Sequence, residues 1–324
     1  MIYTSRGITD CRAPGRGCGA VAGRPADALD YSVTTNIDHQ TATIPTGETG
    51  AEVWTRYPLD VAAADRQVER ALGMIAEGAP LPALCWYWAV EPTLILGVFQ
   101  PAEVINEAAA AARGVPLVRR RSGGTGVLAG PPLLSLDIAL PPGHRLALPD
   151  VTESYHWLGR AWLATMEAIG VRGARLVPIA AVRAAPHRPL RHLPVGPIPD
   201  EDLVRLACFG SLSPYEVAIG PRKLVGFSQV RRRGGLLLQV GLPLTWEADL
   251  LAALLAARPD DRPRLARLLR EHAVGLDELL PAVPAPQEIM AVFEQVLAAD
   301  WGVRLESIAP DSGAHTEHSS LRSE

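Results

Sequence analysis

The sequence contains few cysteines: Cys11, Cys18, Cys85 and Cys208 are spread unevenly over 324 residues and form no CxxC pair. A disulfide framework or a structural zinc site needs more cysteines at closer spacing, so we expect neither of them. Sparse, unpaired cysteines are typical of proteins in a reducing compartment. We therefore predict a cytoplasmic protein without a metal site.

Aromatic residues, long hydrophobic runs and an excess of one charge are also scarce. Aromatics make up 5% of the chain, so the core has to be built mainly from Leu, Val, Ile and Ala. The most apolar stretch, residues 81–99, is interrupted by Glu91 and Pro92, which argues against a membrane span. The formal net charge of −4 gives no overall attraction to nucleic acid or to an anionic membrane, and we expect neither as a partner.

Helical and strand patterns alternate along the chain, and several predicted strands follow one another after short turns. This arrangement predicts the α+β class, with mixed β-sheets flanked by helices. The spacing of apolar residues predicts helices over 60–77, 102–113 and 150–170, the last capped by Asp150 or Thr152, and two or three more within 247–299. The predicted strands are 83–90, 93–99, 116–121, 133–140, 216–219, 223–229 and 235–242.

Composition divides the chain into three parts. Residues 1–50 show no sustained periodicity and are predicted to be a disordered N-terminal extension, and the polar residues 309–324 to be a flexible tail. Residues 51–308 are predicted to form one folded domain. Within it, residues 179–202 are rich in proline and should form a long surface loop, in which we do not expect His187 and His192 to bind a metal.

A basic, glycine-rich segment is the first candidate for ligand binding. A predicted strand ends in arginines and is followed by a turn of small residues, in the order Arg119, Arg120, Arg121, Ser122, Gly123, Gly124, Thr125 and Gly126. Glycines let the backbone approach a ligand and present its N–H groups, and arginine supplies charged planar donors for phosphate or carboxylate. We expect a phosphopantetheine, an adenylate or an acyl carboxylate to bind here, with an ordinary basic turn as the alternative.

Cys208 and Lys223 are the candidates for covalent chemistry. Cys208 follows the proline-rich segment, and Lys223 lies in a turn that enters a predicted strand. A thiolate forms thioesters readily, a nearby cation raises the thiolate fraction, and a lysine can stabilise the negative oxygen that develops during acyl transfer. The alternatives are a buried, unreactive cysteine and a solvated lysine.

Polar residues interrupt three apolar strands. Gly226, Ser228 and Gln229 lie in one predicted strand and Gln239 in the next. Polar residues inside a strand usually line a site or bond to a neighbour, and a solvated edge strand is the alternative. Asp137 interrupts an earlier strand, where we expect it to pair with an arginine or to face solvent.

Together these segments resemble the superfamily of biotin and lipoate ligases and lipoyl transferases. The Arg-Ser-Gly-Gly segment resembles its first signature. Residues 215–231 resemble its second, in which a strand, a tight turn with a lysine and a strand with small residues and a glutamine follow in order. The resemblance covers residues 54–244 and implies a biotin/lipoyl ligase-like catalytic domain, with Lys223 contacting the carbonyl of the bound acyl group. Residues 208–213 resemble a loop of cysteine-dependent octanoyltransferases and amidotransferases, which implies that Cys208 carries the acyl chain as a thioester.

The resemblance also implies substrates and partners. An octanoyl or lipoyl group would be moved, without a cofactor, to a lysine of a lipoyl domain in a 2-oxoacid dehydrogenase or to the glycine-cleavage H protein. Acyl carrier protein is a possible donor. Lys223 and backbone N–H groups near the glycine turn would stabilise the oxyanion, and a tunnel lined by Leu, Val and Ile would hold the acyl chain.

Two other functions stay open. An ATP-dependent lipoate–protein ligase would bind adenylate at the glycine-rich segment, would need ATP and Mg²⁺, and would not need Cys208. A non-catalytic member would only bind a lipoyl domain or an acyl ligand. Residues 127–130 and 238–241 lack histidines that many members have, and Gln239 is more similar to the amidotransferase branch, which weakens the ligase hypothesis.

Overall fold

The large β-sheet is the frame on which the rest of the domain is built. A computed structural model describes residues 51–98, 100–121, 124–183, 198–256 and 258–308. The sheet runs in the order β12-β1-β3-β7-β11-β10-β9-β8, and β2 pairs with β3. Its strands are β1 (Glu52–Arg56), β2 (Asp60–Ala62), β3 (Ala83–Ala89), β7 (Leu133–Leu140), β8 (Ala174–Leu176), β9 (Val217–Ile219), β10 (Arg222–Arg232), β11 (Gly235–Pro243) and β12 (Val303–Ser307).

Parallel and antiparallel pairs are mixed in this sheet, as predicted. β1 pairs in parallel with both β12 and β3, whereas β3, β7, β11 and β10 form consecutive antiparallel ladders. A smaller sheet has the order β5-β4-β6. Its strands are β4 (Thr93–Leu96), β5 (Leu117–Arg119) and β6 (Val127–Ala129).

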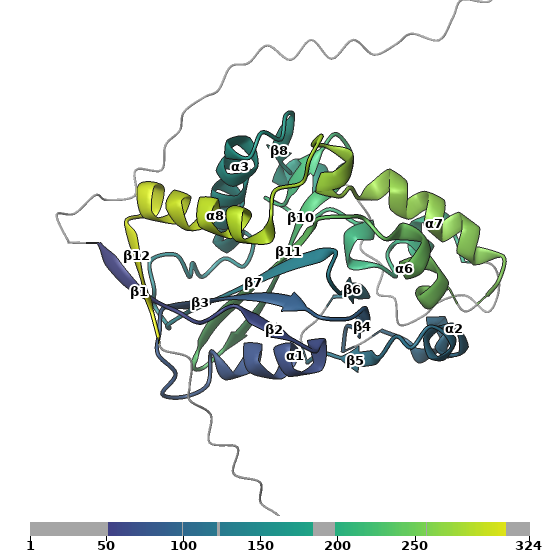
Figure 1. The fold of residues 1–324 in the computed structure, drawn as a ribbon, viewed down its shortest axis with the longest axis horizontal. Coiled ribbons are helices and arrows are strands. Elements are labelled where there is room, and N and C mark those ends of the chain that lie inside the picture. The colour runs from purple at the N-terminus through teal and green to yellow at the C-terminus, as the bar shows by residue number, and fades with distance from the viewer. Residues whose placement is uncertain (1–50, 99, 122–123, 184–197, 257, 309–324) are drawn as a thin grey trace, which may run out of the picture. The chain divides into compact units, whose positions relative to one another are not determined.

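The two faces of the large sheet are covered by different helices. One face packs against α3 (His156–Ala168) and α8 (Pro286–Trp301), which lie above the sheet in Figure 1. Trp86 from β3 meets Trp162 and Phe293 there, with ring centroids 6.1 and 5.6 Å apart. α1 (Ala64–Gly73) lies on the opposite face. The site described below is built on this second face.

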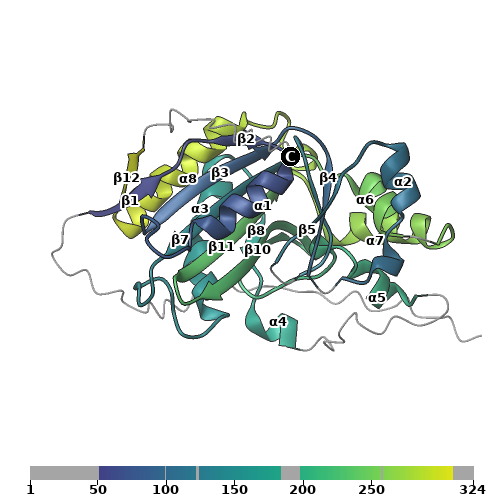
Figure 2. The ribbon, with the colours of Figure 1, turned by 90° about the horizontal axis from the view of Figure 1, so that it is seen from below.

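A second hydrophobic cluster lies beside the small sheet (Figure 2). It joins residues of β4 to four helices that pack together through leucine and alanine side chains. These helices are α2 (Glu107–Ala112), α5 (Asp200–Val204), α6 (Ala248–Leu255) and α7 (Asp261–His272). Short elements complete the domain: α4 (Ile179–Arg183) and the 3-10 turns η1 (Ala102–Val104), η2 (Glu153–Tyr155), η4 (Cys208–Gly210) and η5 (Leu276–Glu278).

Most predicted elements are present, with several boundaries in the wrong place. The strand predicted over 133–140 coincides with β7. The helix predicted over 60–77 is wrong at its start, because Asp60–Ala62 pairs with β3 as a strand. The helix predicted over 150–170 begins at His156, after η2, and the Asp150 carboxylate accepts the N–H groups of Thr152 and Glu153 at 2.7 and 2.9 Å.

Other expectations need correction or lie outside the described residues. The loop predicted over 179–202 has helices α4 and α5 at its two ends. The helix predicted over 102–113 is divided into η1 and α2. Strands β1, β6, β8 and β12 were not predicted. The extension at 1–50, the tail at 309–324 and the two histidines of the proline-rich segment lie outside the described residues. Among the helices that are described, none has the length and apolar character that crossing a membrane requires.

Candidate active site

Lys223 is a buried cation at the start of β10. Its side chain is 1% exposed, which excludes the solvated lysine considered from the sequence. The Nζ atom donates hydrogen bonds to Glu216 Oε1 at 2.8 Å and to the Cys208 carbonyl oxygen at 3.0 Å, and lies 5.5 Å from the centre of the Phe209 ring. The ammonium is therefore fixed beside the backbone of the predicted nucleophile.

Cys208 joins this lysine to the glycine-rich segment. The Cys208 N–H donates to the Gly126 carbonyl oxygen at 2.9 Å, and the Gly126 N–H donates to the Leu206 carbonyl oxygen at 3.0 Å. The cysteine is partly exposed and packs beside a small apolar cluster of Val127, Leu133, Phe209, Trp246 and Ala273. The backbone of Cys208 thus contacts both the predicted lysine and the end of the glycine turn.

Glu216 is a functional candidate that the sequence analysis missed. It is 1% exposed, and its Oε1 accepts Lys223 Nζ at 2.8 Å and the Phe227 N–H at 3.0 Å, while Oε2 accepts the Ser213 N–H at 2.6 Å. Burial raises the pKa of this carboxyl group, and Lys223 and the two N–H groups oppose that rise. The available signal was an acidic residue at the start of a predicted apolar strand.

The arginines bind backbone carbonyls in this structure. Arg119 Nη1 donates to the carbonyl oxygens of Gly97 at 2.8 Å and Gln100 at 3.0 Å, and Arg120 Nη2 donates to that of Thr125 at 3.2 Å. Arg119 thus ties the start of this segment to residues 97–100, and Arg120 contacts its far end. Arg121 is exposed, and residues 122 and 123 lie outside the described ranges. Anion binding by this segment therefore stays a prediction.

Glycines next to Lys223 let Phe209 pack close to the sheet. Gly226 in β10 pairs with Gly241 in β11. A Cβ atom at Gly226 would lie 3.3 Å from both Lys223 Cδ and Phe209 Cζ, and one at Gly241 would lie 3.6 Å from Phe209 Cζ. Phe209 thus packs directly over this glycine pair, and any side chain at Gly226 would press on the lysine stem.

A polar row crosses the same face two residues further along the strands. Ser228 pairs with Gln239, and Gln239 with Asp137, so these side chains share the face of Gly226 and Gly241. Gln239 Nε2 donates to Asp137 Oδ1 at 3.3 Å. Asp137 is buried, so the solvent-facing position is wrong, and among the described residues its side-chain partner is Gln239 and no arginine forms an ion pair with it. Gln229 points elsewhere and donates to the Val151 carbonyl oxygen at 2.7 Å.

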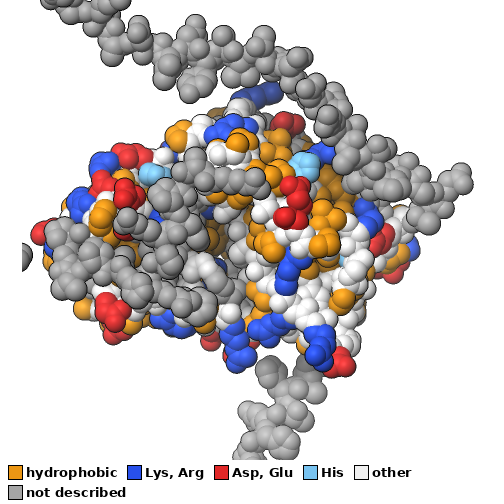
Figure 3. Space-filling model, turned by 180° about the vertical axis from the view of Figure 1, so that it is seen from behind, with side chains coloured by type: hydrophobic (Ala, Val, Ile, Leu, Met, Phe, Trp, Pro, Cys, Tyr) orange, Lys and Arg blue, Asp and Glu red, His pale blue; other side chains and the backbone are white. Residues whose placement is uncertain are grey.

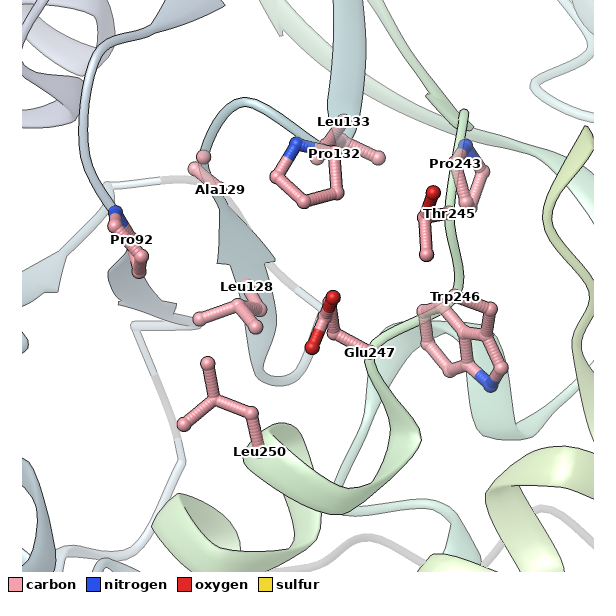
Figure 4. A pocket seen from close by; sticks show the side chains of 11 residues that line it. Pro92, Leu128, Ala129, Pro132, Leu133, Pro243, Thr245, Trp246, Glu247 and Leu250 are labelled. Carbon is pink, nitrogen blue, oxygen red and sulfur yellow. The ribbon is translucent and has the colours of Figure 1, made fainter. Parts of the chain in front are cut away.

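A cavity of about 160 Å³ lies next to the apolar cluster beside Cys208 (Figure 4). It lies between β6, the ends of β7 and β11, and the start of α6. Leu133 and Trp246, which belong to the cluster beside Cys208, also line it, and the Glu247 carboxylate points into its centre. Neither Cys208 nor Lys223 is among the lining residues, so the predicted acyl tunnel between them stays a prediction.

Charges of both signs are interspersed on the face seen in Figure 3. Acidic and basic side chains lie close together between hydrophobic ones. A nucleic-acid surface would gather basic side chains in a continuous stripe or patch. On the part of this face that is drawn in colour, side chains of both signs are mixed.

Comparison with known proteins places the geometry in context. Residues 67–298 match the family described as the lipoyl protein ligase A/B catalytic domain. The octanoyltransferase LipM of Kyrpidia tusciae is 32% identical over 249 residues, which cover 76% of this chain and 85% of that protein. The LipM of Moorella thermoacetica is 32% identical over 69% of this chain and 78% of its own length.

Solved structures show the same fold at lower identity. A bi-partite lipoate protein ligase from Thermoplasma acidophilum, studied with its E2 lipoyl domain, superposes with a TM-score of 0.56 at 16% identity, over 81% of this chain and 88% of that chain. Lipoate-protein ligase A bound with ATP gives a TM-score of 0.53 at 16% identity, over 81% of this chain and 90% of that chain. Both likenesses support the α+β fold predicted from the sequence.

Proposed function

Because the chain belongs to the lipoyl protein ligase A/B catalytic domain family, we propose that it transfers an octanoyl group through a thioester on Cys208 to a lysine of a lipoyl domain. The observation that carries the cysteine mechanism is the hydrogen bond from Lys223 Nζ to the Cys208 carbonyl oxygen, at 3.0 Å. It places the Lys223 ammonium beside the backbone of a partly exposed cysteine, at the position where an acyl-cysteine would form.

The reaction would proceed in two displacements. The Cys208 thiolate attacks the carbonyl carbon of the donor thioester, a new C–S bond forms, and the donor's thiolate leaves with its electron pair. The amine of the acceptor lysine then attacks the acyl-cysteine, which yields an amide and returns the Cys208 thiol. Each displacement passes through a tetrahedral oxyanion, and one donor aimed at that oxygen typically contributes about 10²–10³ in rate.

Lys223 is the best-placed donor for this oxyanion. We expected backbone N–H groups near the glycine turn to share this role, but those of Cys208 and Gly126 already donate to backbone carbonyls. Within the described residues, the lysine ammonium has two oxygen acceptors, Glu216 Oε1 and the Cys208 carbonyl oxygen, and in this proposal its third N–H is the one that binds the substrate oxygen.

The donor and acceptor belong to the same proposal. We infer that the acceptor is the lipoyl domain of a 2-oxoacid dehydrogenase or the glycine-cleavage H protein, and that octanoyl-acyl carrier protein can serve as the donor. This reaction needs no cofactor, because the thioester already supplies an activated acyl group. The lysine that becomes acylated lies on the acceptor.

Replacing Cys208 tests the mechanism directly. Wild-type protein mixed with octanoyl-acyl carrier protein and an unmodified lipoyl domain should octanoylate the domain, and intact mass spectrometry should detect an octanoyl thioester on Cys208. Cys208→Ala should lose both signals. Cys85→Ala is the matched control, because burial raises the pKa of Cys85 to about 12 and keeps that thiol protonated. Normal transfer by Cys208→Ala would exclude the thioester mechanism.

A ligase activity has a separate signature. Lipoate-protein ligase A, which shares the fold, was solved with ATP bound. Incubation of this protein with lipoate, ATP and Mg²⁺ should release no pyrophosphate above background if it is a transferase. Pyrophosphate release that persists in Cys208→Ala would instead assign the ligase function.

A further inference from the structure

Glu216 is a buried carboxylate that contacts three separate parts of the candidate site. It lies just before β9, directly after the segment that begins with Cys208. Its two oxygens accept the Lys223 ammonium, the Phe227 N–H of β10 and the Ser213 N–H, at 2.8, 3.0 and 2.6 Å. One side chain thus joins the lysine, the cysteine-bearing segment and the central sheet.

These contacts leave the lysine little freedom. A lysine side chain loses considerable rotamer entropy when it is held in one conformation, so a buried ammonium needs partners that fix it. Glu216 and the Cys208 carbonyl hold Nζ from two sides, and Gly226 and Phe209 pack against the aliphatic stem. The direction of the remaining N–H is therefore set by Glu216 as much as by the lysine itself.

We propose that Glu216 is a positioning residue for acyl transfer: it aligns Lys223 with the Cys208 segment so that one N–H of Lys223 meets the acyl carbonyl oxygen. This inference rests on the proposed function. The hydrogen bonds of Glu216 join it to Lys223, Phe227 and Ser213, so in this proposal it acts through the lysine. Preorganised donors accelerate a reaction because they need no rearrangement when charge develops on the oxygen.

The test compares two reactions of the same sulfur in the full-length protein. With p-nitrophenyl octanoate, the Cys208 thiolate forms a C–S bond to the acyl carbon, and p-nitrophenolate leaves with the electron pair of the broken C–O bond. With iodoacetamide, the thiolate displaces iodide and no oxyanion forms. Peptide mass spectrometry assigns each product to Cys208 rather than to another cysteine.

A positioning role predicts that the two reactions respond differently. Glu216→Gln should lower acylation of Cys208 by p-nitrophenyl octanoate about 10²-fold, whereas its alkylation by iodoacetamide should not fall. Glu216→Asp should recover part of the acylation rate, because it keeps a carboxylate on a shorter stem. A purely structural role would lower both rates together in Glu216→Gln, and that result, or an unchanged acylation rate, would overturn the proposal.

A double-mutant cycle tests whether Glu216 works through Lys223. Adding Glu216→Gln to Lys223→Met should lower acylation no further than Lys223→Met alone, whereas independent losses would multiply and contradict the proposal. The matched control is Glu278→Gln. It breaks the exposed pair with Arg222, next to Lys223 in sequence, at 2.6 Å, and should leave both reactions unchanged.

The outcome is separable from that of the proposed function. A wild-type protein that is not acylated at Cys208 by p-nitrophenyl octanoate would overturn the positioning role along with the thioester mechanism. If Cys208 is acylated and responds to Glu216 as expected, but no octanoyl group reaches a lipoyl domain, only the proposed acceptor is contradicted.

Discussion

Asp137 carries a carboxyl group in the middle of β7, on the face where the polar row crosses the sheet. Burial raises its pKa to about 7, and the hydrogen bonds with Gln239 and Tyr87 oppose the rise. An apolar strand accepts such a residue because the neighbouring amide and phenol supply hydrogen-bonding partners at that position. The Asp137 carboxyl group therefore gains or loses its proton near neutral pH, where Gln239 and Tyr87 are both uncharged.

Asp137 should give the fold a measurable pH dependence. With a folded pKa of about 7 against an ordinary 3.8, the native state binds this proton between those values and the unfolded chain does not. The free energy of unfolding should therefore fall as pH rises from about 4 to about 7 and then level, by up to about 4 kcal/mol for this group. Urea unfolding of the wild type should give a lower free energy of unfolding near pH 8 than near pH 5. In Asp137→Asn this difference should disappear. Asp200→Asn is the control and should keep the fall, because hydrogen bonds from Arg264 and Arg267 lower the pKa of Asp200, so its charge does not change between pH 5 and 8. An equal slope in Asp137→Asn would contradict the assignment.

Individual residues also show which parts of the candidate site could be predicted from the sequence. Cys208 and Lys223 were singled out because each has distinctive chemistry and the resemblance set their order, and the structure places them in contact. Glu216 was missed because its partners, Lys223 and the backbone of Phe227, are brought to it only by the β9–β10 pairing. The Asp137–Gln239 contact likewise depends on the register of two strands that lie far apart in the chain.

At the scale of strands, Gly226 in β10 and its pairing partner Gly241 in β11 are predicted to differ in how well they tolerate a methyl group. Gly226→Ala places Cβ 3.3 Å from Lys223 Cδ, a contact that forces the lysine stem to shift, whereas Gly241→Ala places Cβ no closer than 3.5 Å to its neighbours. Gly226→Ala should therefore lower Cys208 acylation about ten-fold or more, and Gly241→Ala clearly less. The two rates are measured with p-nitrophenyl octanoate; a larger loss in Gly241→Ala would show that Gly226 does not set the lysine position.

Elements were predicted well where the local pattern and the tertiary partners agree. β7 is a mostly apolar strand that follows two prolines, and it is buried on both faces, so its limits were found. Asp60–Ala62 was assigned to a helix because Leu59 and Val61 fit helical spacing, yet pairing with β3 decides its conformation. β1, β8 and β12 are short and depend on partners distant in sequence, so a window of neighbouring residues holds no signal for them.

At the scale of the whole molecule, residues 51–308 are predicted to be sufficient for folding and acylation. The matched family region, 67–298, lacks β1, β2 and β12, which complete one edge of the large sheet. A chain of residues 51–308 should unfold within about 3 °C of the full chain, and one of residues 51–301 should melt at least about 5 °C lower, because β1 loses its outer partner. Thermal unfolding by circular dichroism provides both values. Equal melting of the two shortened chains would show that β12 is dispensable.

The parallel ladder between β1 and β12 joins residues from nearly opposite ends of the domain, as in the pairing of Glu52 with Val303. During synthesis, β1 leaves the ribosome early, whereas its partner β12 is made only after almost the whole domain has been translated. Through that interval its outer edge offers unpaired N–H and C=O groups to any other extended chain. The nascent protein is therefore exposed to aggregation at β1, and a chaperone that covers this strand would protect it until β12 has left the ribosome and can pair with it.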